Sequence, residues 1–541
     1  MEDDRRSIMK FSHPLKRLFV VFGLSVAIPL LARERPNILH VITDDMGYSD
    51  IGSYGSEIET PNLDELADRG LRFTNFYVNN MCWPTRASLL TGLYPKTALP
   101  AAGSHREGLH PEAVTLPQAL KSVGYTTLAS GKWHLSNRDE NDGPHAPHHR
   151  GFDQYFGTLD GTSDYFAPSM VQLNGRNMEH EWQDNPDYYY TDSITDYALK
   201  FLQEADQSQP FYLYLSYNAA HWPLHAKPED IEHYAGRYQM GWDKLREQRH
   251  ARMKALGVVD PGWQLSPRNE EVPAWDETED QVWQQRRMEV YAAQVTSMDR
   301  NVGRVIDALK ASGKFDNTLI IYHHDNGGCH VEYPPERTGS WTREFTTDGT
   351  KTPIVPGNLP TVMPGPQSSF QSYGYGWANV ANTPFRYFKQ YDHEGGTRSP
   401  LIVSWPNGLH AGLAGGVTSE LGHAIDIMPT LIEAAQVGRI EQKPMPFEGQ
   451  SLLATITGDP SIQVERGPLF WAHNKGWAVR EGDWKLVSKN KKTWELYNLI
   501  EDGTELNDVA AEYPAKVAAM EKLFEAWDQR TNLAARAARN E

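Results

Sequence analysis

The chain has 541 residues, of which 39% are hydrophobic and 23% charged, a composition typical of globular proteins. This length exceeds what one typical core needs, so we expect two domains, one of them large. Lys and Arg number 52 against 70 Asp and Glu, a net charge of −18, which argues against a nucleic-acid partner. Any positive potential must therefore be local.

Residues 1–32 have the pattern of an export signal. Lys10, Lys16 and Arg17 precede an apolar run over residues 18–31, and Ala32 offers a small residue for cleavage. A membrane anchor is the alternative, but the run is short and Pro29 interrupts it. We expect an exported protein, periplasmic or secreted, without stable membrane insertion; an uncleaved tether stays open.

Apolar, β-branched runs alternate with helical patterns over residues 33–443, the larger of the two expected domains. The expected strands are residues 37–42, 125–129, 211–217, 318–322 and 401–403. The expected helices are residues 61–69, 111–122, 191–205, 284–311 and 425–435. Because such alternation is typical of parallel sheets covered by helices, we predict an α/β fold with a large, mixed but mostly parallel sheet.

Three stretches interrupt this alternation. Residues 137–190 and 333–387 are predicted to be long irregular loops, which in compact domains usually form lids or bind ligands. Residues 239–280 combine many charges with three tryptophans and indicate a helical insertion, either solvated or forming a wall of a cleft.

The pattern changes near residue 444. Short runs at residues 469–471, 477–480, 484–487 and 495–497 are separated by turn residues, and a helical pattern follows at residues 515–530. We predict a small antiparallel sheet with one covering helix, a C-terminal α+β subdomain over residues 444–541.

Oxygen-bearing side chains follow two expected strands. Asp44 and Asp45 come after the first, and Asp325 and Asn326 come after the fourth. Ligand sites form at the carboxyl ends of parallel strands, so these donors are expected to meet. Oxygen donors suit calcium or magnesium better than zinc. Taken alone, an Asp-Asp pair at a strand end is more often a turn or a cap.

Lys132 and His134 follow the second expected strand. Two residues apart, they would project from the same side of an extended segment. A lysine can hold oxyanion oxygens as a point charge, and a histidine can move protons near neutral pH. In isolation, a surface lysine and a packed histidine would be the commoner interpretation.

Cys82 and Cys329 are the two cysteines of the chain. Cys82 stands in the sequence Met-Cys-Trp-Pro-Thr-Arg, just before a short helical run. It could be a nucleophile at a positive helix end or a buried free thiol. If Cys82 is modified, Cys329 has no partner, so we expect no disulfide and interpret Cys329 as inert.

Together these elements resemble the type I, formylglycine-dependent sulfatases of the alkaline phosphatase superfamily. The Cys-x-Pro-x-Arg run resembles the signature in which a formylglycine-generating enzyme oxidises the cysteine. Gly-Lys-Trp-His at residues 131–134, Ala-His-Trp-Pro at 220–223 and Lys389 before the Glu-Gly-Gly turn match further family elements in family order. The signature departs at Thr85, where serine is commonest.

The resemblance implies an arylsulfatase-like hydrolase of sulfate esters, acting on sulfated carbohydrates or aryl sulfates. It implies one calcium ion, held with the formylglycine of position 82 by Asp44, Asp45, Asp325 and Asn326. Countercharge for the sulfate is implied for Arg86, Lys132 and Lys389. The resemblance makes His221 the acid that protonates the leaving alcohol, and His134 the base that helps to release sulfate from residue 82.

Two other functions stay open. The first is a phosphonate or phosphodiester hydrolase of the same superfamily, which activity ratios on matched esters would separate. The second is a sulfated-glycan binding protein with unconverted Cys82, which the mass of that peptide would reveal. Of the other histidines, His145, His148 and His149 are interpreted as surface residues, and His225 as structural or substrate-facing.

Overall fold

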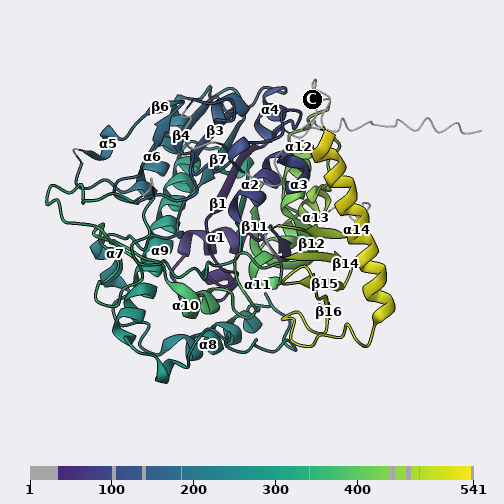
Figure 1. The fold of residues 1–541 in the computed structure, drawn as a ribbon. Helices are drawn as coiled ribbons and strands as arrows, with labels where there is room; N and C mark the ends of the chain where they lie inside the picture. The colour runs from purple at the N-terminus through teal and green to yellow at the C-terminus, as the bar shows by residue number, and fades with distance from the viewer. Residues whose placement is uncertain are drawn as a thin grey trace, which may run out of the picture. The chain divides into compact units, whose positions relative to one another are not determined.

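The computed structural model describes residues 34–99, 105–136, 142–183, 185–339, 342–438, 440, 445–458, 465–473 and 476–537, so the expected export signal lies outside them. Ten strands of this part of the chain form one sheet: β1 (Asn37–Thr43), β2 (Leu71–Tyr77), β3 (Thr126–Gly131), β4 (Gln154–Thr158), β5 (Val171–Leu173), β6 (Arg176–Asn177), β7 (Phe211–Ser216), β8 (Thr318–His324), β11 (Arg398–Ser404) and β12 (Gly416–His423). Their order is β12-β2-β11-β8-β1-β7-β3-β4-β5-β6, with helices around the sheet (Figure 1).

The centre of this sheet is parallel. Strand β1 pairs in parallel with β8 and β7, and β7 pairs in parallel with β3. Strand β11 runs antiparallel to both of its neighbours, as do β5 and β6 at the far edge. The predicted fold class, a large mixed sheet between helices, is confirmed.

Alternate residues of β1 enter two hydrophobic cores, as the period of a strand requires. Leu39 and Val41 face one core, and Ile38 and Ile42 face the other. The first core lies under α1 (Pro61–Arg69), α6 (Tyr190–Glu204) and α9 (Gln281–Ala311). The second lies under α2 (Cys82–Thr91), α4 (Leu116–Lys121) and α12 (Ile427–Ala434). A strand buried on both faces gives its polar end residues a fixed position.

Several predictions of local structure were wrong. The stretch 137–190 contributes β4, β5 and β6, and 333–387 contains β9 (Val355–Pro356), β10 (Ser369–Phe370) and α10 (Gly374–Ala381). Strands of two to five residues leave too little alternation to be recognised. Strands β2 and β12 were not predicted, because β2 is buried on both faces and β12 lies at the sheet edge. The helix predicted at 111–122 begins only after Thr115, which forms a capping box.

The insertion at residues 239–280 is packed, so its solvated interpretation is wrong. It contains α8 (Gly241–Ala255), and its tryptophans Trp242, Trp263 and Trp275 are all buried. These rings join the core that also holds α9. Helix α8 can therefore fix the position of other buried groups.

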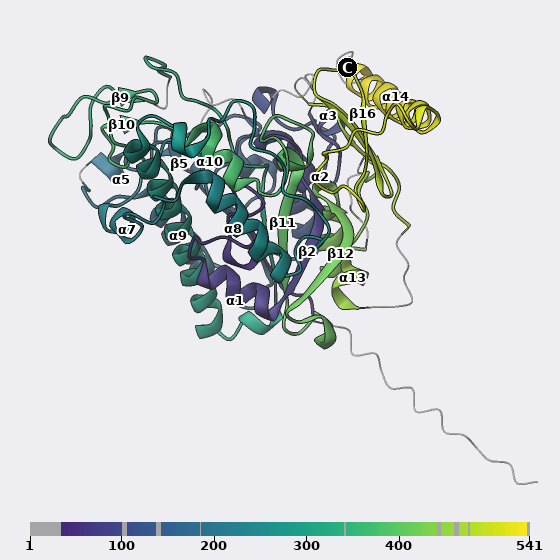
Figure 2. The same ribbon diagram turned by 90° about the horizontal axis from the view of Figure 1, so that it is seen from below.

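The predicted C-terminal sheet is present as β13 (Leu469–Trp471), β14 (Trp477–Glu481), β15 (Trp484–Ser488) and β16 (Glu495–Asn498). All its pairings are antiparallel, and α14 (Pro514–Ala537) lies against it (Figure 2). Tyr77 of β2 belongs to its hydrophobic core, and residues from Arg35 onward form one compact unit. The boundary between residues 443 and 444 falls outside the described residues and stays a prediction.

A search of the described helices finds none that is long and apolar enough to traverse a bilayer.

Candidate active site

Four parallel strands end at one edge of the sheet and bring the polar clusters together. Thr43 of β1 is in register with His324 of β8, and Gly131 of β3 is in register with Ser216 of β7. The residues that follow these strands therefore emerge side by side, as expected for a parallel sheet. They include Asp44, Lys132, His221 and Asp325.

Cys82 is the first residue of α2, which follows β2 at the same edge. The hydroxyl of Thr85 accepts a hydrogen bond from the Asn79 amide at 2.9 Å and donates one to the Met81 carbonyl at 3.1 Å. These bonds fix the turn that presents Cys82. A serine hydroxyl could form both, so the threonine in the signature retains this function.

The three aspartates each receive a charged donor. Lys132 Nζ donates to Asp44 Oδ2, and Lys389 Nζ donates to Asp45 Oδ1. Arg86 donates from Nε and Nη2 to Asp325 Oδ2, at 3.1 and 2.9 Å. Three cations thus face three carboxylates. All six side chains are at most 6% exposed, so water screens their charges weakly.

Three oxygens of this cluster have no hydrogen-bond donor among the described residues. They are Asp44 Oδ1, Asp45 Oδ2 and Asn326 Oδ1, and all three are buried. Buried polar atoms are nearly always satisfied, so unmet lone pairs on clustered oxygens are a donor set that suits a cation. Ligand atoms of Asp44, Asp45 and His221 lie within 4.8 Å of one another, as do those of Asp44, Cys82 and Asp325. These residues fit a calcium or magnesium ion.

The pKa values of the cluster follow from burial and charge. Burial raises the pKa of Asp44, and the neighbouring Asp325 raises it further against the charge of Lys132. Burial also acts to raise the pKa of Asp45, but Lys389 and His221 outweigh it and hold that pKa below its usual range. A cation bound here would favour the ionised form of both carboxylates.

The two histidines occupy different environments. His221 Nδ1 lies 2.7 Å from the Trp222 carbonyl and so carries the hydrogen, while Nε2 faces Asp45 Oδ2 at 3.3 Å. Burial, with a smaller contribution from Lys389 and against the charge of Asp45, lowers the pKa of His221 to about 3. His134 packs its ring edge-on against Trp83 at 5.4 Å.

Lys132 and His134 do not share one extended face, so that prediction was wrong. Strand β3 ends at Gly131, and His134 has a φ of 60°. The chain turns at this point: Lys132 points to Asp44 beneath the site, while His134 lines the cavity above it.

A cavity of about 300 Å³ opens over the site, at the lower end of volumes for ligand pockets. The predicted residues on its wall are Cys82, His134, His221 and Lys389. Sequence reasoning missed the other wall residues that carry polar or aromatic side chains, namely Trp83, Arg106, Asp160, Thr162, Trp222, Arg337 and Gln390. They come from loops without a recognisable pattern, although Trp83 and Trp222 stand next to predicted residues.

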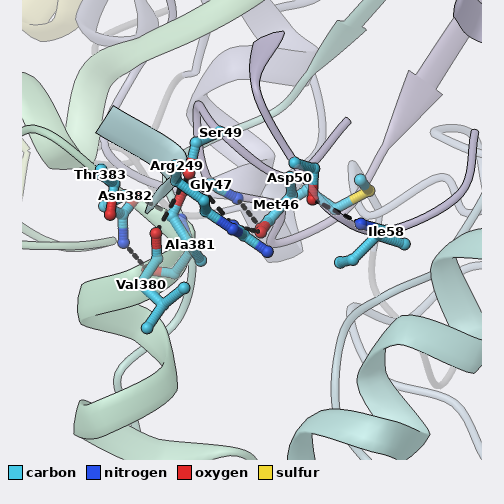
Figure 3. Close-up of polar contacts among 12 residues, drawn as sticks. Met46, Gly47, Ser49, Asp50, Ile58, Arg249, Val380, Ala381, Asn382 and Thr383 are labelled. Atoms are coloured by element: carbon cyan, nitrogen blue, oxygen red, sulfur yellow. Dashed lines mark hydrogen bonds and ion pairs between the residues drawn. The ribbon is translucent and has the colours of Figure 1, made fainter. Parts of the chain in front are cut away.

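Arg249 of α8 contacts the part of the loop that follows Asp44 and Asp45 (Figure 3). Arg249 donates to Asp50 Oδ1 at 2.6 Å and to Ser49 Oγ at 3.1 Å. Ser49 Oγ donates in turn to the Ala381 carbonyl at 2.9 Å, and Asp50 Oδ2 accepts from Gly47 N at 2.8 Å. The insertion, predicted to be either solvated or a wall of the cleft, therefore supports the loop that carries Asp44 and Asp45.

The C-terminal sheet supports the turn that carries Lys389. Glu394 Oε1 accepts from Lys485 of β15 at 2.7 Å, and Oε2 accepts from Tyr77 at 2.7 Å and from Arg398 at 3.0 Å. Burial acts to raise the pKa of Glu394, but Lys485 and Arg398 outweigh it and lower that pKa to about 2. This buried ionic contact could not be read from the sequence.

The remaining histidine candidates lie apart from this arrangement. Both nitrogen contacts of His148 and His149 go to Asp142, a partner that sequence reasoning missed, while the His145 carbonyl accepts from Trp133. His225 is buried against Ser369, a structural position. Cys329, interpreted from the sequence as inert, lies on the cavity wall. It and Cys82 are both free thiols, and burial raises the pKa of each.

Comparison with known proteins agrees with this geometry. The sulfatase family model matches residues 36–437, and the C-terminal model of N-sulphoglucosamine sulphohydrolase matches residues 384–530. The chain belongs to the sulfatase family, has the alkaline phosphatase-like fold and is a sulfuric ester hydrolase.

Alignments with individual relatives cover most of the chain. An uncharacterised sulfatase of Schizosaccharomyces pombe is 32% identical, covering 91% of this chain and 93% of that protein. The arylsulfatase of Klebsiella aerogenes is 31% identical, covering 78% of this chain and 92% of that protein. The structure of Ps i-CgsB in complex with k-i-k-neocarrahexaose has a TM-score of 0.64 at 27% identity, covering 91% and 93% of the two chains.

Proposed function

We propose that this hydrolase releases sulfate from sulfated saccharides with a formylglycine made from Cys82 and a calcium ion. The observation that carries the proposal is the position of Cys82. It begins α2 beside a carboxylate cluster with three unmet oxygens, and its Sγ lies 3.9 Å from Lys389 Nζ. A thiol with a pKa raised by burial is a poor nucleophile, which favours conversion over direct use of the thiol.

The calcium ligands in this proposal are Asp44, Asp45, Asp325 and Asn326, with residue 82 completing the set. When present, the ion supplies countercharge and the formylglycine supplies a hydroxyl oxygen for attack on sulfur. Three cations already balance three carboxylates, so the two charges of the ion leave the site positive for a sulfate ester. Lys389 on the cavity wall would orient the oxygens of that ester, and Lys132 and Arg86 would add countercharge from beneath.

His221 is the proposed acid. Nδ1 donates to the Trp222 carbonyl, so the proton for the leaving alcohol must come from Nε2. Burial and Lys389 oppose a charged imidazole in the free protein. A bound sulfate ester offsets the lysine charge and favours the acid form. His134, across the cavity, is the proposed base for release of sulfate.

Saccharide substrates are supported by the relatives. N-acetylglucosamine-6-O-sulfatase of Bacteroides thetaiotaomicron is 25% identical over 97% of this chain, and Ps i-CgsB binds a neocarrahexaose. The cavity also has aromatic walls, Trp83 and Trp222, which are typical surfaces for sugar rings. An export signal at residues 1–32 would direct the protein to the periplasm or outside the cell, where it would encounter polysaccharides. A formylglycine-generating enzyme would convert Cys82 during maturation. The proposed domains remain 33–443 and 444–541.

The test combines mass spectrometry with a sulfate-release screen. The peptide containing residue 82 should be lighter by the change from thiol to aldehyde, and the protein should release sulfate from at least one defined saccharide. Full activity in a preparation with only unmodified cysteine would refute the mechanism. Greater activity on matched phosphate esters would favour the phosphonate or phosphodiester hydrolase.

The histidine roles have a separate test. His221→Ala should slow hydrolysis of sugar sulfates, whose alcohols are poor leaving groups, far more than that of phenol sulfates. His134→Ala should slow both classes alike and give a burst of alcohol before slow turnover. Equal dependence of both variants on the leaving-group pKa would show that the roles are wrongly assigned.

A further inference from the structure

Arg337 differs from the other cations that surround the active site. It lies on the cavity wall with Cys82 and Lys389, and its side chain is exposed. Within the described residues its guanidinium forms no ion pair, including with Asp160, the carboxylate on the same wall. Lys132, Lys389 and Arg86, by contrast, each contact an aspartate. The charge of Arg337 is therefore available to a ligand.

Aromatic rings hold Arg337 in position. Its Cζ lies 5.9 Å from the ring centroid of Trp222 and 5.4 Å from that of Tyr333, within the range of cation–π attraction. The Tyr333 hydroxyl also donates to the Arg337 carbonyl at 3.2 Å. Pro334 and Pro335 restrict the backbone between Tyr333 and Arg337, which limits the positions that this guanidinium can take.

Arg337 lies beside the proposed reacting groups, but its charge is not required to neutralise the scissile sulfate. The Trp222 ring that Arg337 contacts lies tilted against His221, with ring centroids 4.6 Å apart, so Arg337 lies on the side of the cavity where His221 is proposed to protonate the leaving alcohol. The sulfate itself is neutralised by the buried set of charges. A guanidinium binds carboxylates and sulfates through two parallel hydrogen bonds, a geometry that a neutral sugar cannot use.

We propose that Arg337 is a specificity-determining residue that binds a second anionic group of the substrate, carried by the sugar that leaves or its neighbour. This inference rests on the proposed saccharide function. The second group is a carboxylate or another sulfate, and the substrate is therefore an acidic or multiply sulfated saccharide.

The test uses three disaccharides with the same scissile sulfate: one otherwise neutral, one with a hexuronic acid in place of a hexose, and one with a second sulfate. Arg337→Gln should reduce the preference in kcat/KM for one or both anionic substrates over the neutral one by about tenfold to a hundredfold. The loss should be in KM. Arg337→Lys should retain part of the preference, since it keeps the charge without the two parallel bonds.

Arg69→Gln is the matched control, because Arg69 is a surface arginine paired with Glu65 on α1. It should keep the wild-type preference. The inference is overturned if Arg337→Gln leaves the preference unchanged, or if it slows all three substrates equally, which would mean that Arg337 only supports Trp222. If the wild-type protein, with residue 82 shown to be converted, hydrolyses none of the three, the proposed saccharide function fails and this inference fails with it.

Discussion

Two buried carboxylates in the same loop have opposite surroundings. Both oxygens of Asp50 are satisfied, Oδ1 by Arg249 at 2.6 Å and Oδ2 by the Tyr291 hydroxyl at 2.7 Å. Asp44, six residues earlier, receives Lys132 on Oδ2 and nothing from the described residues on Oδ1. Both side chains are fully buried.

The difference in hydrogen-bond partners distinguishes a carboxylate that stabilises the fold from one that can bind a ligand. A buried ion pair with every lone pair satisfied is complete, and removing one partner mainly costs stability. A buried carboxylate with an oxygen that no described residue contacts is costly to keep charged until a ligand supplies the partner. Such a group keeps its charge when a cation binds. The loop thus anchors itself through Asp50 and presents Asp44 and Asp45 to a ligand.

The largest effect is expected from Asp44→Asn. The substitution keeps the shape of the side chain but removes a ligand charge, so turnover should fall roughly a thousandfold, equivalent to about 4 kcal/mol in the barrier. Steady-state kinetics on a sulfate ester measure this. Activity within a few-fold of wild type would exclude Asp44 from the site.

Asp50→Asn tests the structural carboxylate of the comparison and should mainly destabilise the fold. Its new amide would face two donors and leave Arg249 with less countercharge, so the free energy of unfolding should fall by about 3 kcal/mol. Denaturant titration measures this loss, and Asp44→Asn should lose less. As a control, Arg252→Met on the same helix removes a partly exposed arginine and should cost at most about 1 kcal/mol. Equal losses in the free energy of unfolding for Asp50→Asn and Asp44→Asn would contradict the distinction between the two carboxylates.

A smaller effect is expected from acid. Burial lowers the pKa of His323 to about 4 and that of His324 to about 3, so the folded state resists their protonation. The unfolded chain takes up these protons below about pH 6.5, and stability is therefore lost as the pH falls. Each histidine should cost about 1 kcal/mol at pH 5.5. Denaturant midpoints at pH 7.5 and 5.5 would show it; the exposed His233→Gln should keep the same slope, and equal midpoints would contradict the account.

The sequence predicted the elements with strong local patterns. Strand β1 and the motif beginning at Cys82 could be placed because apolar runs and signature residues are local. The short strands β4 to β6 could not, and neither could Arg249 or Lys485, since a charged residue carries no sign of the distant partner it will meet. Arg337 was also identified from the fold alone, because only the structure shows that its guanidinium forms no ion pair with a described carboxylate.

The most direct test is a calorimetric titration of chelator-treated protein with calcium. Wild type and Asp50→Asn should each bind one calcium ion per chain, measured where Asp50→Asn is still folded, whereas Asp44→Asn should bind it far more weakly. Calcium binding by Asp44→Asn as tight as that of wild type would contradict the claim that the unmet oxygens mark the metal site.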